Sequence, residues 1–402
     1  MSDQYHDDIM CVDGRRLPTL FIVGAQKCAT SSIAKQLFAR SAFSPGRPFE
    51  DQLWFSSAKE HHFFDVPERW RRGLRYYATS FPRCSEAQLT LDATPNYLSS
   101  AGAAARLAQA YGPARLARTS FVVVLCEPIR RAQSALYHFR GVMLGAFIFP
   151  LVPAEQQTPT TRHIGWPWRS FRDRVHRDVR ARTFSGALYA MGRYGAQLDA
   201  WLEATGRLSV VPLPLYSRHE LATLREIECR VMHRSAHGTD PPADACDASR
   251  VHEPPPGARI NSNSHPPLWA DIGRADAATL ATSFECSNQH VHVLLETHPN
   301  VSVLPAGFGK QEWVHFLEPA YLPPPEARSR APPWLAYGAI PLMQDVLTHL
   351  WRPSAPTPRV GRENWVLTLL LFALLLAGLT TACGCTVHVL RFRVPSRSAV
   401  LV

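Results

Sequence analysis

Residues 17–32 read LPTLFIVGAQKCATSS, and they predict a strand, a tight turn and the start of a helix. The apolar run at 20–23 leads to Gly24, Lys27 and three consecutive hydroxyl residues, Thr30, Ser31 and Ser32. A strand that ends in a tight turn before a helix points backbone N–H groups and the positive end of the helix dipole at an anion. We therefore expect a phosphate-binding loop, although it lacks the G-K-[ST] ending of the nucleotide triphosphatases.

Two further apolar runs, at 121–125 and 208–212, also precede a predicted helix. Pro128 follows the first run and fits the opening turn of a helix, where its missing N–H costs no hydrogen bond. The helices that we expect are 32–40, 128 to about 140, 189–202 and 219–232. Strands that alternate with helices in this way predict an α/β fold, a P-loop-like parallel sheet flanked by helices.

The composition indicates a globular protein with a basic surface. Hydrophobic residues make up 46% of the 402 residues, charged residues make up 19%, and the formal net charge is +10. Such a charge favours an anionic partner, but no nucleic-acid-binding motif accompanies it, so we expect no nucleic acid. The arginine-rich stretch at 162–182 predicts a solvated helix face, with a platform for an anionic acceptor as the alternative.

Residues 365–387 read WVLTLLLFALLLAGLTTACGCTV and carry no charge. This run exceeds the roughly 20 residues that cross a bilayer, and arginines flank both of its ends, so we predict one C-terminal transmembrane helix and a single-pass membrane protein. The start of the chain has no apolar run of the signal-peptide type, which favours a C-terminal anchor with the domain facing the cytosol. If a further segment precedes this sequence, the domain faces a lumen and we expect the Golgi.

The chain therefore divides into five predicted parts. They are an N-terminal tail at 1–17, one globular domain at 18–318, a Pro-rich stalk at 319–362, the transmembrane helix at 363–390 and a basic tail at 391–402. Within the globular domain, residues 236–256 read as a long irregular connection because Pro, Asp, Ala and Gly dominate them.

The nine cysteines show no metal-ligand spacing, so we expect no metal site. Cys28 and Cys126 adjoin predicted strands, where we expect buried thiols that pack as small hydrophobic side chains. Cys229 and Cys246 are candidates for a disulfide if the domain faces an oxidising compartment, but the sequence alone does not pair them.

The loop and several later segments resemble the sulfotransferases that use PAPS, 3′-phosphoadenosine 5′-phosphosulfate, and most of all the heparan sulfate and carbohydrate type. Besides the loop, residues 59–65 (KEHHFFD), 91–98 (LDATPNYL) and 126–134 (CEPIRRAQS) match family segments in the right order. The segments 192–202 (GRYGAQLDAWL) and 259–268 (RINSNSHPPL) extend the resemblance. It implies the sulfotransferase fold for most of the domain.

The resemblance also implies roles for particular residues. Glu60 is the expected general base, which takes the proton of the acceptor, and Lys27, His62 and Asp65 complete the catalytic set. Ser134 would donate to the 3′-phosphate of the donor. The implied cofactor-binding residues are Gly24, Lys27, Cys28, Ala29, Thr30, Ser31, Ser32, Arg131, Ser134 and Arg259.

Two positions depart from the family pattern. Cys126 stands where the family carries an arginine that grips the 3′-phosphate, and Arg130 is the nearest replacement. Ala93 stands where glycan-binding members carry lysine, which leaves the acceptor open.

The sequence thus predicts an enzyme that moves a sulfuryl group from PAPS to a hydroxyl or amine of a carbohydrate acceptor, without a metal. One alternative is a non-catalytic, membrane-tethered relative that only binds, which the departures at 126 and 93 favour. The other is a P-loop kinase or NTPase, which the missing G-K-[ST] ending disfavours.

Overall fold

The computed structural model describes residues 9–40, 42–49, 57–86, 89–148, 170–184, 186–242, 245–246 and 268–318. The predicted stalk, transmembrane helix and basic tail, which together span 319–402, lie outside these ranges. Among the residues that are described, no helix combines the length and the apolar character needed to cross a membrane.

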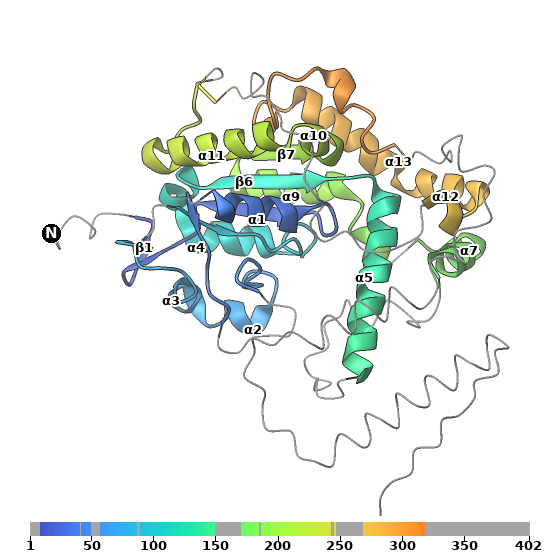
Figure 1. The fold of residues 1–402 in the computed structure, drawn as a ribbon, viewed down its shortest axis with the longest axis horizontal. Coiled ribbons are helices and arrows are strands. Elements are labelled where there is room, and N and C mark those ends of the chain that lie inside the picture. The colour runs from blue at the N-terminus through green and yellow to red at the C-terminus, as the bar shows by residue number, and fades with distance from the viewer. Residues whose placement is uncertain are drawn as a thin grey trace, which may run out of the picture.

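A parallel sheet forms the centre of the described chain (Figure 1). Its strands are β3 (Leu20–Gly24), β4 (Phe43–Ser44), β5 (Leu89–Asp92), β6 (Ser120–Leu125), β7 (Leu208–Pro212) and β8 (Val301–Val303), and their spatial order is β4-β5-β3-β6-β7-β8. Every neighbouring pair is parallel. The predicted parallel α/β sheet is therefore confirmed, and the apolar runs are its central strands because both faces of a parallel sheet are covered.

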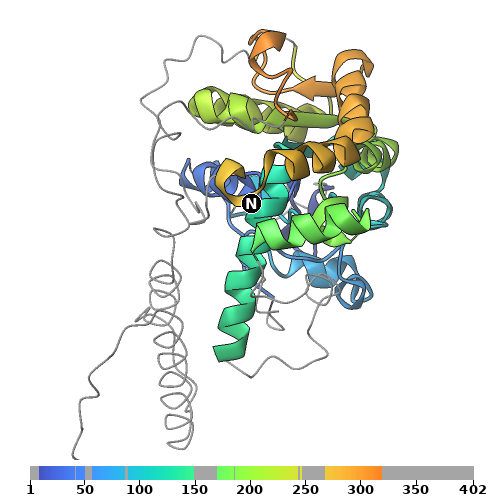
Figure 2. The same ribbon diagram turned by 90° about the vertical axis from the view of Figure 1, so that its right-hand side faces the viewer.

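Helices cover both faces of the sheet. On one side α1 (Thr30–Ala39) packs against α11 (Glu220–His237), and on the other α4 (Ala103–Ala117), α9 (Tyr194–Thr205) and α13 (Arg274–Thr297) pack together (Figure 2). The remaining elements are α2 (Pro67–Trp70), α3 (Gly73–Ala78), α5 (Pro128–Ile148), α7 (Phe171–Ala181), α8 (Ala187–Ala190), α10 (Leu213–Arg218), α12 (Leu268–Asp271), the 3₁₀ helix η2 (Lys310–Glu312) and the hairpin β1 (Cys11–Val12) and β2 (Arg15–Arg16).

One predicted helix is wrong in its boundaries. The expected helix at 189–202 is instead two helices, α8 and α9, separated by a turn at 191–193. A Cβ on Gly192 would lie 3.1 Å from Phe284 and 3.2 Å from Pro128, so this turn presses closely against α5 and α13. Tertiary packing of the glycine therefore ends the helix that the apolar stripe predicts.

A second cluster of buried side chains joins α5 to α7, α8, α12 and α13. Within the described part of the arginine-rich stretch, Phe171 and Val175 of α7 belong to this cluster, whereas Arg172, Arg177 and Arg180 are exposed. The prediction of a solvated helix face is confirmed for these residues. The cluster also fixes the start of α5, which leaves the sheet at the carboxyl end of β6 (Figure 1).

Candidate active site

The candidate site lies where β3, β5 and β6 end. These three strands are parallel neighbours, so their carboxyl ends meet at one edge of the sheet. The chain runs from β3 to strands on one side and then returns to β6 on the other, which makes this edge the switch point where α/β proteins bind ligands. The loop after β3, the segment after β5 and the start of α5 therefore adjoin.

The loop after β3 requires the glycine at its start. A Cβ on Gly24 would lie 2.5 Å from the Cβ of Leu98 and 3.1 Å from the carbonyl oxygen of Pro95, so no larger residue fits. Lys27 and Ala29 both adopt positive φ angles, 74° and 67°. Ala29 precedes α1 and makes no side-chain capping hydrogen bond, so the start of α1 has no side-chain cap. This geometry suits an anion at the helix N-terminus.

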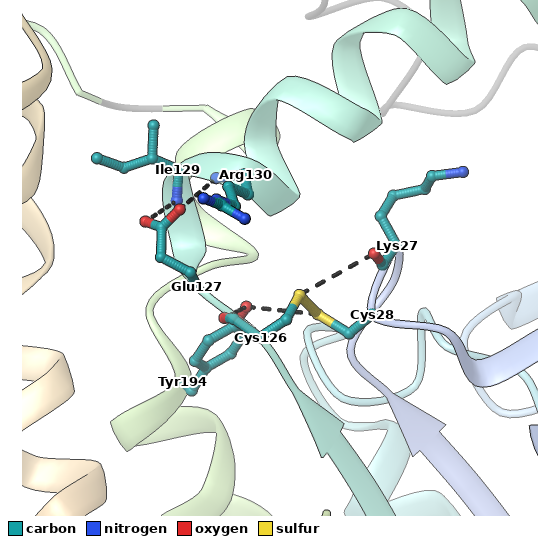
Figure 3. Close-up of a disulfide and its surroundings, with 7 residues drawn as sticks. All are labelled: Lys27, Cys28, Cys126, Glu127, Ile129, Arg130 and Tyr194. Atoms are coloured by element: carbon teal, nitrogen blue, oxygen red, sulfur yellow. Dashed lines mark hydrogen bonds between the residues drawn. A yellow bond between two sulfur atoms is a disulfide. The ribbon is translucent and has the colours of Figure 1, made fainter. Parts of the chain in front are cut away.

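Lys27 lies in the middle of the loop. Burial lowers the pKa of its ammonium to about 8. Figure 3 shows its side chain pointing away from Cys28 and Tyr194. No ion pair holds Lys27 within the described part of the chain, so its charge is not neutralised by a neighbouring carboxylate.

Cys28 and Cys126 form a disulfide, so the prediction of two buried thiols is wrong. Both residues are buried as expected, but β3 and β6 end side by side and place the two Cα atoms 5.5 Å apart, within the range that a disulfide spans. The bond ties the phosphate-type loop to the residue that follows β6 (Figure 3). Tyr194 braces this junction, because its hydroxyl donates to the carbonyl oxygen of Cys126 at 3.0 Å.

Two other disulfides are present among the described cysteines. Cys229–Cys246 is the pair that the sequence left open, and Cys11–Cys84 joins the β1–β2 hairpin to the loop before β5. Cys286 is free and exposed.

The start of α5 is organised by a buried carboxyl. Glu127 accepts hydrogen bonds from the backbone N–H groups of Ile129 and Arg130 at 2.7 and 2.8 Å, and thereby caps the helix. Burial raises the pKa of Glu127 to about 7. The cap orients the helix that carries Ser134.

The two predicted cofactor-binding residues of α5, Arg131 and Ser134, lie in different surroundings. Arg131 is 1% exposed and donates to the carbonyl oxygen of Leu188, which turns it into the packing against α8. Ser134, one turn further on, is half-buried. Arg259 lies outside the described residues.

Glu60, His62 and Asp65 come together as a chain of side chains. His62 Nδ1 lies 2.7 Å from Asp65 Oδ2, and its Nε2 lies 3.6 Å from Glu60 Oε2. The backbone N–H of His62 donates to the hydroxyl of Thr94 at 3.2 Å, which attaches this segment to the end of β5. The imidazole of His62 thus lies between two carboxylates, and it can orient Glu60 while Asp65 holds it.

Asp92, at the end of β5, was not singled out from the sequence, although it holds this region together. Its carboxylate accepts hydrogen bonds from the hydroxyls of Tyr77, Thr94 and Tyr97 at 2.7, 2.6 and 2.9 Å. Its side chain is fully buried. The sequence offers only the short segment LTL before Asp92 as a signal, and a carboxylate that is buried there needs partners.

Lys59 and His138 were also missed. Lys59 contacts the carboxylate of Glu60, and its backbone carbonyl accepts from the N–H of Ala93 at 2.7 Å. Desolvation lowers the pKa of Lys59 to about 7, with Lys35 and Lys27 adding to the effect. Desolvation, Lys27 and Lys59 likewise lower the pKa of His138, a residue of α5. Lys27, Lys59 and His138 are therefore within electrostatic reach of one another.

The resemblance to sulfotransferases implies a parallel sheet and a loop that begins at Gly24, and the structure contains both. Comparison with known proteins confirms this resemblance. The chain is 26% identical over 220 residues to the human bifunctional heparan sulfate N-deacetylase/N-sulfotransferase 2, a match that covers 52% of this chain and 22% of that protein.

Two shorter matches point to the same class. Identity is 30% over 120 residues to the mouse heparan sulfate glucosamine 3-O-sulfotransferase 3A1, covering 30% of this chain and 26% of that protein. It is 32% over 120 residues to the human heparan sulfate glucosamine 3-O-sulfotransferase 6, covering 30% of each. The matches thus span less than a third of the length of each of these relatives, and no protein-family model matches the chain.

Among solved structures, a sulfotransferase from Alicyclobacillus acidocaldarius is similar at 22% sequence identity, with a TM-score of 0.38 over 69% of this chain and 95% of that one. This score is too low to add to the sequence matches.

Proposed function

We propose that the chain is a sulfotransferase that moves a sulfuryl group from PAPS to a hydroxyl or amine of a carbohydrate acceptor. The observation that carries the proposal is that two segments adjoin the carboxyl ends of neighbouring strands: the loop with Lys27 follows β3, and the Glu60–His62–Asp65 chain is attached beside the end of β5. The similarity to three heparan sulfate sulfotransferases supports both the reaction and a glycan acceptor.

The loop residues fit the phosphosulfate end of PAPS. Gly24 lets the backbone turn closely, the start of α1 has no side-chain cap, and Lys27 carries a charge that no ion pair neutralises in the described residues. Thr30 and Ser31 follow at the first turn of α1, where their hydroxyls and N–H groups would hold the 5′-phosphate. When bound, PAPS supplies an activated sulfuryl group on a phosphate leaving group.

In the proposed step, the acceptor oxygen or nitrogen forms a bond to sulfur while the bond from sulfur to the phosphate oxygen breaks. Glu60 takes the proton that the acceptor loses, and His62, held by Asp65, orients the glutamate. Lys27 stabilises the negative charge that develops on the departing phosphate oxygen, assisted by loop N–H groups. No redox partner is needed, because the electron pair of the broken bond stays on the phosphate.

The disulfide favours a second candidate, a relative that keeps the fold and binds without catalysis. Cys126 is bonded to Cys28, so it offers neither a charge nor a free thiol to a 3′-phosphate. Ser134 would then hold that phosphate with less electrostatic help than an arginine gives. The two candidates have different expected outcomes. The enzyme transfers the sulfuryl group to an acceptor, whereas the binding protein binds the nucleotide without transfer.

We also propose that the predicted C-terminal span anchors the protein in a membrane with the domain in the Golgi lumen. Three disulfides among the described cysteines support this orientation over the cytosolic one, because disulfides persist in oxidising compartments.

The test is to incubate the full-length protein, in detergent, with labelled PAPS and a panel of glycans. Transfer of label to a glycan is expected for the enzyme. Nucleotide binding without transfer to any glycan would favour the non-catalytic relative, and absence of both would contradict the proposal.

A further inference from the structure

Lys59 occupies a position at the site that the proposed mechanism does not use. It precedes Glu60 directly, and its side chain is only 15% exposed, which is unusual for a lysine. Its backbone carbonyl is fixed to the end of β5 by the hydrogen bond from Ala93. Both its main chain and its side chain are therefore held at the edge where the strands end.

Charged groups from several described elements act on Lys59. Asp92 of β5 and Glu60 are negative, whereas Lys27 of the loop and Lys35 of α1 are positive, and His138 of α5 lies within reach of the field of Lys59. Of the carboxylates, Asp92 already accepts from three hydroxyls. Glu60 is thus the carboxylate that pairs with the Lys59 ammonium.

This pairing changes during the proposed transfer. While Glu60 is ionised, it holds the ammonium of Lys59. When Glu60 receives the acceptor proton, it becomes neutral and the ion pair is lost. The lysine is then left as an uncompensated cation beside the group that is moving, at the moment when negative charge shifts onto the sulfuryl and phosphate oxygens.

We propose that the ammonium of Lys59 is the second cation of the transfer site and binds oxygens of the sulfuryl group, a role that rests on the proposed function. Lys27 then serves the phosphate side of the breaking bond and Lys59 the sulfuryl side. Lys59 is accordingly a catalytic residue rather than a structural partner of Glu60.

The test compares full-length wild type with Lys59→Met and with Lys35→Met, an exposed lysine in the same electrostatic field. The loss of one charge-assisted hydrogen bond corresponds to about a 10- to 100-fold change in a rate or binding constant. We expect Lys59→Met to lower kcat/KM for sulfuryl transfer by this factor and to weaken binding of PAPS, but to leave binding of the desulfonated nucleotide, which has no sulfuryl group, unchanged. Lys35→Met is expected to change none of these.

A second variant keeps the inference testable if Lys59→Met does not fold. Lys59→Arg retains the charge at high pH, so its transfer rate should persist to about pH 8, whereas the wild-type rate should fall from about pH 7. Equal pH profiles for the two proteins, or equal loss of affinity for both nucleotides in Lys59→Met, would overturn the inference. A wild type that transfers nothing would instead refute the proposed function.

Discussion

At the scale of single residues, the central group is the ammonium of Lys27. Its place in the loop between β3 and α1 could be predicted from the sequence, because a phosphate-binding loop needs a glycine at its start and a cation further on. Its electrostatic state could not, since the pKa of its ammonium is lowered to about 8 by burial, which depends on the fold. The same holds for Lys59, whose pKa desolvation lowers to about 7.

The lowered pKa of Lys27 predicts an alkaline loss of donor binding. The ammonium carries its charge below about pH 8 and loses it as the pH rises through that value, so affinity for the desulfonated nucleotide should fall above pH 8. Calorimetric titrations at pH 7 and pH 9 measure this, with Lys27→Arg, which stays charged, as the control. Affinity that does not change over this range in the wild type would contradict the role of Lys27.

Glu127 gives a second prediction at this scale, about stability. The folded state raises its pKa from 4.5 to about 7, so the protonated form is favoured in the folded protein and the stability from this group is lost as pH rises through 7. The wild type should therefore lose unfolding free energy between pH 5 and pH 8, and Glu127→Gln should lose about 1–3 kcal/mol less over the same range. Denaturant unfolding at the two pH values measures it, and Glu285→Gln, an exposed glutamate of α13, should reproduce the wild-type pH dependence.

At the scale of elements, the continuous apolar runs predicted β3, β6 and β7 well, because a short strand that is buried on both faces of a parallel sheet has that composition. β5 was missed: its four residues, LTLD, are too few for a periodic signal. α4 was missed as well: Gly112, which precedes Pro113, has non-helical dihedral angles and interrupts this helix. Short strands and interrupted helices depend on tertiary packing, which a local pattern does not contain.

The pairing of Cys28 with Cys126 could not be predicted for the same reason. The two residues are 98 positions apart, and they meet only because β3 and β6 become neighbours in the sheet. At the position where the family carries an arginine, this chain has a covalent bond to the loop. We interpret the disulfide as a constraint that holds the loop in its binding conformation.

This interpretation predicts that removing the disulfide weakens nucleotide binding. Replacing Cys28 and Cys126 together by alanine should lower the unfolding free energy by about 2–4 kcal/mol and also lower the affinity for the desulfonated nucleotide. The matched control replaces Cys11 and Cys84, which close a similar separation of 73 residues before the amino ends of β3 and β5. The control should lose comparable stability and keep its affinity; equal affinities for both double variants would contradict the interpretation.

At the scale of the whole molecule, the orientation in the membrane has a direct reporter. Asn300, Val301 and Ser302 form a glycosylation sequon, and Asn300 is exposed just before β8. If the domain lies in the lumen, protein from cells should lose mass on treatment with an N-glycosidase, and Asn300→Gln should remove that shift. Labelling of an intact domain by a cytosol-restricted reagent would contradict the lumenal orientation.

In the proposed function, Lys27 and Glu60 together perform sulfuryl transfer at one edge of the sheet. The most direct measurement is the rate of transfer from radiolabelled PAPS to glycan acceptors by full-length wild type and Glu60→Gln. We expect transfer by the wild type and a loss of about 100-fold or more in the variant, with binding of the desulfonated nucleotide retained. Equal rates for the two proteins, or a wild type that neither transfers nor binds, would contradict it.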